Sequence, residues 1–93
     1  MTTKEAFAKA LKSARKARGL TQEDFSLVSS RTYLSTLERG MKSPTLEKVE
    51  VLAKTLNIHP LTLLALTYLK ANPRMSLDSL CRKIDKELQT IEP

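Results

Sequence analysis

The sequence predicts an all-α fold, and three observations support this prediction. Apolar residues recur at steps of three and four along several stretches, which is the period of one helix face. Residues that typically begin and end helices stand between these stretches. No stretch alternates apolar and polar residues as a half-buried strand would. The chain has 93 residues, enough for one modest core, so we expect a single all-helical domain.

The first helix is expected over residues 3–18, and Gly19 stands where a helix C-cap is expected. Its apolar face comprises Ala6, Phe7, Ala10, Leu11, Ala14 and Ala17. Thr21 is the expected N-cap of a second helix. Gln22, Glu23 and Asp24 fill its first turn, where carboxylates suit the helix dipole.

Four more helices are expected after the second. Ser30 caps a third helix that runs from Arg31 to Arg39, and Gly40 ends it. Thr45 opens a fourth, with Leu46, Val49, Leu52, Ala53 and Leu56 on its inner face. Pro60 begins a fifth, since proline suits the first helical position. The sequence therefore predicts five short helices and then a sixth, amphipathic helix at the C-terminus.

The last two helices carry more apolar surface than one small core needs. Between Leu61 and Leu69 almost every side of the fifth helix is apolar, which predicts cover on every side. The sixth helix, capped by Ser76, carries a stripe of Leu77, Leu80, Cys81, Ile84, Leu88 and Ile91. We expect this stripe to pack on the fifth helix or to form a dimer surface, which would bury the Cys81 thiol. Residues 1–70 are thus the main domain, and residues 71–93 are its C-terminal extension.

Charge and composition exclude several classes of function. The net charge is +6, and residues 1–42 carry nine basic and four acidic side chains. A basic half suggests a polyanionic partner, with nucleic acid ahead of a membrane surface. The single cysteine excludes an internal disulfide and a cysteine-based metal site. One histidine and one cysteine do not assemble a catalytic triad, and His59 is expected to be structural. We therefore expect no enzyme activity, no cofactor and no membrane span.

The third helix has the pattern of an element that enters the DNA major groove. Leu34 and Leu37 would anchor it to the core. Four residues would then face outward as base readers: Arg31, Thr32, Ser35 and Thr36. Arginine pairs with guanine through two hydrogen bonds, and threonine offers a hydroxyl or a methyl group. Tyr33 is expected to pack its ring on the protein and to bring its hydroxyl near a phosphate.

Five motifs, in this order, resemble the helix-turn-helix domain of Cro/cI-type (XRE family) transcriptional regulators. They are Leu20-Thr21-Gln22-Glu23, Tyr33-Leu34-Ser35, Glu38-Arg39-Gly40, Ser43-Pro44-Thr45-Leu46 and Leu52-Ala53-Lys54-Thr55-Leu56. The resemblance covers about residues 5–65 and implies a lambda-repressor-like helix-turn-helix bundle. One departure is the spacing from Thr21 to Tyr33, which is shorter than in similar domains and contains no glycine. The second helix or the following turn must therefore be shortened.

The resemblance also implies roles for individual residues. Arg31, Thr32 and Thr36 match base-reading positions. Gln22 matches a position that contacts phosphate and braces the recognition helix. Ser30, Arg39 and Lys42 match positions near the sugar-phosphate strand. Arg15 and Glu38 match a pair that forms a structural salt bridge between the first and third helices.

Together these observations predict a sequence-specific DNA-binding regulator, most simply a repressor, in the cytoplasm of a bacterium or phage-infected cell and associated with the nucleoid. It would bind a roughly palindromic double-stranded operator as a homodimer formed through the fifth and sixth helices. The alternative is a protein-interaction module, such as an antitoxin whose C-terminal helix binds a partner protein. A stand-alone phage-type repressor or immunity protein has the same chemistry as the first possibility.

Overall fold

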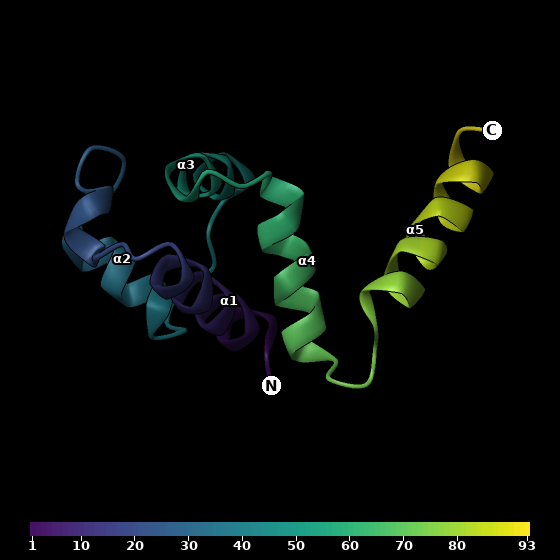
Figure 1. Ribbon diagram of the computed structural model, residues 1–93, viewed down its shortest axis with the longest axis horizontal. Helices are drawn as coiled ribbons and strands as arrows, with labels where there is room; N and C mark the ends of the chain where they lie inside the picture. The colour runs from purple at the N-terminus through teal and green to yellow at the C-terminus, as the bar shows by residue number, and fades with distance from the viewer.

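The structure is a computed structural model that describes all residues 1–93. It contains helices and no strand, which confirms the all-α class. The elements are α1 (Thr3–Ala17), η1 (Gln22–Phe25), α2 (Arg31–Glu38), α3 (Leu46–Leu56), α4 (Pro60–Ala71) and α5 (Leu77–Ile91). Figure 1 shows their arrangement, with α1 to α4 gathered into one body and α5 beside it.

Most helices begin where the sequence predicts because a side chain caps the first turn. Thr45 Oγ1 accepts a hydrogen bond from the Lys48 amide at 3.1 Å, and Ser76 Oγ accepts one from the Ser79 amide at 3.1 Å. Pro60 stands at the start of α4. Such caps satisfy amide groups that have no partner within the helix. These boundaries are therefore determined locally.

The second of the six expected helices is not an α-helix. Residues 22–25 form a single 3-10 turn, and the chain then continues through turns to Ser30. The Asp24 carboxylate accepts hydrogen bonds from the Thr21 amide at 2.7 Å and from its hydroxyl at 3.0 Å. Phe25 is the only buried residue of the 3-10 turn, whereas Leu27 after it is 98% exposed. The short distance from Thr21 to Tyr33 leaves too little chain for a full helix and a turn.

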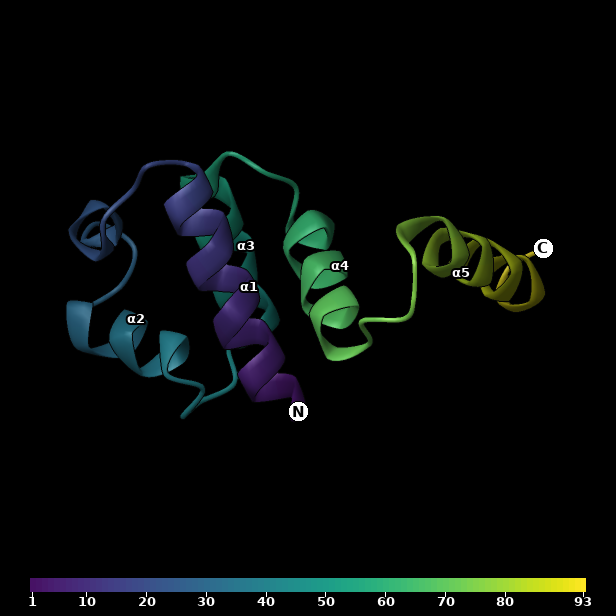
Figure 2. The same cartoon turned by 60° about the horizontal axis from the view of Figure 1, so that its bottom comes forward.

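The core lies where α1 to α4 meet. Its buried residues are Phe7, Ala10, Leu11, Phe25, Leu34, Leu37, Val49, Leu52, Leu56 and Leu63. Helix α1 packs on α4 and on α2, and it lies between them in Figure 2. Burial of these apolar side chains is the main force that holds the body together.

A glycine in the left-handed conformation ends α2 close to the start of α1. Gly40 has φ +72°, a left-handed conformation that favours glycine, and it ends α2. A Cβ atom there would stand 3.4 Å from the Glu5 Cα and 3.7 Å from the Ala8 Cβ. These are ordinary van der Waals distances, so the left-handed backbone conformation, and not a lack of space, is the reason for a glycine at residue 40.

Helix α5 does not pack on α4, contrary to one of the two expectations for the C-terminal stripe. None of its residues is buried, and Figures 1 and 2 both show it held away from the body. The radius of gyration is 14.0 Å, against about 12 Å for a compact chain of this length. The expectation of a buried Cys81 thiol is wrong for the same reason, because Cys81 is exposed.

No helix by itself is both long and apolar enough to cross a bilayer. Helices α3 and α4 would reach that length and composition only as a pair, and the chain bends by 103° between them. Both helices also supply buried core residues.

Candidate nucleic-acid interface

Helix α2 is fixed to the body on one side and open on the other. Leu34 and Leu37 are fully buried. Ser30 Oγ accepts a hydrogen bond from the Tyr33 amide at 3.0 Å, so the helix begins at a defined residue. Arg31 and Thr32 are exposed on the opposite side. The buried leucines therefore hold the first turn outward, as a recognition helix requires.

Five of the side chains expected to contact DNA lie around one shallow, open hollow beside α2. Its lining residues are Gln22, Arg31, Thr32, Ser35 and Arg39, and none is apolar. Gln22 comes from η1 and the other four from α2 or its C-cap. Two guanidinium groups and several hydrogen-bonding groups thus share one surface. Such a surface suits a phosphate backbone and the base edges beside it.

A buried ion pair fixes the far end of α2 to α1. Arg15 Nε donates to Glu38 Oε2 at 2.6 Å, and Arg15 Nη2 donates to Glu38 Oε1 at 3.0 Å. The two side chains are only 12% and 3% exposed. The hydrogen bond with Glu38 raises the pKa of Arg15, although burial acts in the opposite direction. Arg15 Nη1 also donates to the Leu20 carbonyl at 2.9 Å, so the guanidinium connects three segments.

Gln22 also contacts the Arg15–Glu38 ion pair. Its Nε2 atom donates to Glu38 Oε1 at 3.1 Å, and the residue is partly buried. The amide therefore braces α2 against η1 while it also lines the open hollow. Its second N–H and its carbonyl oxygen have no hydrogen bond within the protein, so they remain for a ligand.

The hydroxyl of Thr36 is engaged by its own helix. Thr36 Oγ1 donates to the Thr32 carbonyl at 2.7 Å. A hydroxyl has one donor and two acceptor positions. Thr36 in this arrangement offers an external partner only acceptor positions, besides its methyl group. Arg39 Nε makes a longer contact of 3.4 Å with the Ser35 carbonyl, and Arg39 is exposed.

Tyr33 carries two lysines over its ring, and one of them was missed in the sequence. The ring packs against the core. Lys48 Nζ lies 5.1 Å and Lys42 Nζ lies 5.9 Å from the ring centroid, within the range of a cation–π interaction. Lys48 Nζ also donates to the Val28 carbonyl at 2.9 Å. Lys48 is in α3, and no local pattern indicates that the first turn of α3 lies beside Tyr33.

The structure offers no metal centre here or elsewhere in the chain. No three side chains among histidine, cysteine, aspartate and glutamate lie close enough to share a metal ion. The basic groups on the α2 side are Arg31, Arg39, Lys42 and Lys48. Glu38, the acid at the end of α2, is paired with Arg15. The exposed surface around α2 is consequently cationic.

A helix-turn-helix family model matches residues 11–63, which is more than half of the chain. The match spans the end of α1, η1, α2 and α3, and it reaches into α4. The chain therefore belongs to the helix-turn-helix family, as a regulator of the Cro/cI type (XRE family). Searches among curated proteins and among solved structures gave no match.

Proposed function

We propose that the protein is a transcriptional repressor that binds a roughly palindromic DNA operator in a sequence-specific way. One observation carries this proposal: buried Leu34 and Leu37 hold α2 so that Arg31 and Thr32 stay exposed. A short polar and basic helix held in this way fits the major groove of B-form DNA. Family membership supports the DNA-binding part of the proposal.

The proposed contacts divide into two groups. Base edges are contacted by Arg31, Thr32, Ser35 and Thr36, and the DNA backbone by Gln22, Ser30, Tyr33, Arg39 and Lys42. Arg31 at the first turn of α2 would pair with guanine O6 and N7. Thr36, whose hydroxyl proton is held by the Thr32 carbonyl at 2.7 Å, would accept from an adenine or cytosine amino group or contact a thymine methyl group.

The proposed active form is a homodimer. Two copies of α2 would enter successive major grooves about 34 Å apart, so the operator would repeat with inverted symmetry. Occupied DNA would exclude the polymerase and thereby repress transcription. This activity needs no cofactor and no catalytic step, and it takes place in the cytoplasm of a bacterium or phage host, on nucleoid DNA.

Selection of bound fragments from random duplexes tests the proposal. Wild-type protein should enrich one inverted-repeat sequence. Arg31→Ala should lose about 1–3 kcal/mol of discrimination at one base pair of each half-site. Arg74→Ala removes the same charge from an exposed residue outside the hollow, and it should leave the preference unchanged. If Arg31→Ala and Arg74→Ala weakened all sequences equally, α2 would not be the reading element.

One observation favours a second function, that of a protein-interaction module such as an antitoxin. Helix α5 has no buried residue although its stripe is apolar. A foreign protein would then cover this stripe, with or without DNA binding by the body. The mass of the purified chain separates the two functions: a stable dimer supports self-association, and a soluble monomer supports a missing partner.

A further inference from the structure

Two apolar faces of this chain lack cover, and they lie on neighbouring helices. On α4, Leu61 and Tyr68 are 65% and 50% exposed, and Ala65 lies between them on the same face. On α5 the exposed apolar residues are Leu77, Ile84, Leu88 and Ile91, at 55%, 45%, 58% and 72%. Exposed apolar patches of this kind mark interaction surfaces.

The apolar face of α5 has the spacing of a helix-packing seam with acidic edges. Its residues Leu77, Cys81, Ile84, Leu88 and Ile91 follow one another at alternating steps of four and three, which is a heptad pattern. Asp78 and Asp85 flank the seam on one side, and Glu87 flanks it on the other. The basic residues Arg82, Lys83 and Lys86 lie on the back of the helix.

The free face of α4 is complementary to that seam. It carries no charged side chain between Leu61 and Tyr68, and α1 and its C-cap residue place one base beside each end. Lys4 shares a hollow with Leu64 and Tyr68. Arg18 shares another with Thr62 and Leu66. An apolar face with basic edges therefore matches an apolar seam with acidic edges.

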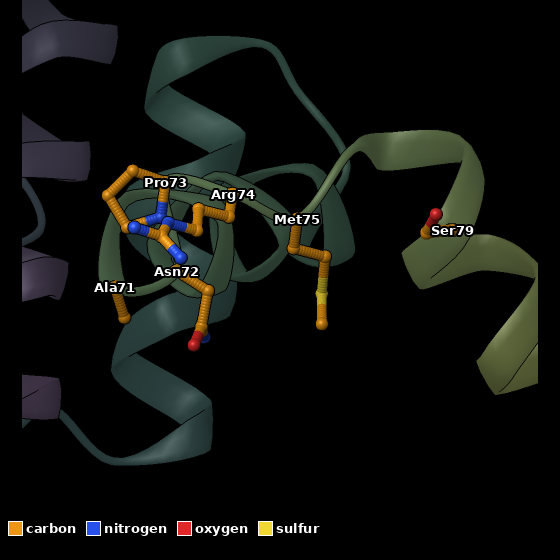
Figure 3. Close-up of a pocket in the computed structure, with 6 residues that line it drawn as sticks. All are labelled: Ala71, Asn72, Pro73, Arg74, Met75 and Ser79. Carbon is orange, nitrogen blue, oxygen red and sulfur yellow. The ribbon is translucent and has the colours of Figure 1, made fainter.

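The linker between the two helices holds α5 outward. The Met75 amide donates to the Asn72 carbonyl at 2.9 Å, and Asn72 Nδ2 donates to the Tyr68 carbonyl at 3.2 Å. Figure 3 shows Ala71, the last residue of α4, and the linker residues 72–75 around the hollow at this elbow, with Ser79 of α5 across from them. This hydrogen-bonded turn stands where the chain leaves α4, and α5 beyond it lies away from the α4 of its own chain (Figures 1 and 2).

We propose that two copies of the chain exchange their C-terminal helices, so that α5 of each copy packs on the free face of α4 in the other. This inference rests on the homodimer of the proposed function and specifies how it is built. One symmetric step would cover both apolar faces. Each contact is a single helix pair. The surface buried in the two contacts adds together, and a stable interface buries roughly 1,200 Å² in total.

Other partners for α5 are less favourable or leave part of the exposed apolar surface uncovered. A parallel α5–α5 coiled coil would place Glu87 of one copy opposite Glu92 of the other, a like-charge contact that destabilises the pair. It would also contain only 15 residues per helix, which is short for a stable helix in isolation. A foreign helix on α5 would leave the α4 face uncovered.

The first test measures the mass of the full chain in reducing buffer over a range of concentrations. We expect a dimer. Leu61→Glu on α4 and Ile84→Glu on α5 should each raise its dissociation constant roughly tenfold or more, because each puts a charge into the apolar contact. Gln89→Glu makes the same charge change outside the seam and should change the constant less than about threefold. A monomeric wild-type chain, or a dimer insensitive to Leu61→Glu, would overturn the proposal.

The second test locates the contact. Cys81 is the only cysteine, so the wild-type chain carries one thiol within the seam. A second, differently tagged chain carries Ala65→Cys with Cys81→Ser. A short bis-maleimide should link wild-type to this variant in a mixture and should not link two wild-type chains. Efficient linkage of Cys81 to Cys81 would instead establish an α5–α5 contact and overturn the exchange.

DNA binding by the same variants separates the two proposals. Ile84→Glu should bind an isolated half-site as wild-type does, but it should lose affinity for the full operator. If the exchanged dimer forms and Arg31→Ala binds DNA normally, the proposed function fails and the exchange stands. If the chain reads an operator through Arg31 while Leu61→Glu stays as dimeric as wild-type, the exchange fails and the function stands.

Discussion

At the residue scale, the carboxylate of Glu38 is the junction between the recognition helix and the body. It accepts hydrogen bonds from Arg15 of α1 and from Gln22 of η1, and its side chain is 3% exposed. A buried carboxylate is tolerated because every partner compensates part of its lost hydration. The buried leucines of α2 are therefore supplemented by one polar group at its last residue, which connects the helix to α1 and η1.

Glu38→Gln should strongly destabilise the fold. It leaves the buried Arg15 guanidinium without a counter-charge, which costs about 3–5 kcal/mol in comparable buried pairs. Urea unfolding followed by circular dichroism measures the change. Asp78→Asn is the matched control, because it breaks the Asp78–Arg82 pair, whose side chains are 71% and 79% exposed, and should cost less than about 1 kcal/mol. Equal effects of the two substitutions would contradict the structural role of Glu38.

Lys48→Met should test the lysine that stacks on Tyr33. The variant keeps the apolar stem but loses the hydrogen bond to the Val28 carbonyl and the cation over the ring. We expect a loss of about 1–2 kcal/mol in the free energy of unfolding. If Lys48 only positions Tyr33 and the turn, operator affinity should fall while its salt dependence stays the same.

Lys54→Met is the control for this experiment, since Lys54 is an exposed lysine on the same helix. It should leave stability and operator affinity unchanged. A salt dependence reduced by about one counterion in Lys48→Met would show instead that Lys48 contacts a phosphate directly.

At the scale of elements, the helix boundaries could be predicted from the sequence because their causes are local. Thr45, Pro60 and Ser76 each start a helix in the structure, as the sequence indicates. The stretch after Thr21 could not be resolved in the same way. A threonine cap with acidic residues starts an α-helix or a 3-10 turn equally well, and the outcome depends on how much chain remains before α2.

The position of α5 could not be predicted from the sequence either. An amphipathic stripe indicates that a helix has a partner surface but does not identify that surface. The fifth helix was the nearest candidate, yet the turn at Asn72–Met75 directs α5 away from it. Exposure of Cys81 follows from this geometry and not from the residue's own properties.

Removal of residues 73–93 should leave the body folded. Helix α5 contributes no buried residue, so the free energy of unfolding of the monomer should change by less than about 1 kcal/mol. Thermal unfolding at low protein concentration, where no dimer forms, measures this. A large loss of stability would mean that α5 packs on the body of its own chain in solution.

At the scale of the whole molecule, the excess of basic side chains lies in the N-terminal half of the chain. Residues 1–42 hold nine of the sixteen basic side chains but only four of the ten acidic ones. A dimer that neutralises about 6–10 phosphates should lose about a thousandfold or more in affinity between roughly 50 and 200 mM salt. Operator binding at several salt concentrations measures this slope. A nearly flat response would exclude the basic surface around α2 as the DNA-binding surface.

How far the site could be read from the sequence depends on the type of contact. Arg31 and Thr32 could be assigned to the open face because the periodicity of Leu34 and Leu37 defines the buried one. Contacts between distant segments could not be derived in that way. Arg15 and Glu38 were paired through the family resemblance, and Lys48 was not found at all because its partners Val28 and Tyr33 come from other segments.

The firm attachment of α2 has a consequence for how new specificities could arise. Buried leucines and the Glu38 hydrogen bonds attach α2 to the body on its inner side. None of its outward side chains takes part in that attachment. Residues 31, 32, 35 and 36 can therefore be substituted without weakening the attachment of the helix. Transplanting another set onto this backbone should retarget the protein to a different operator while its melting temperature hardly moves.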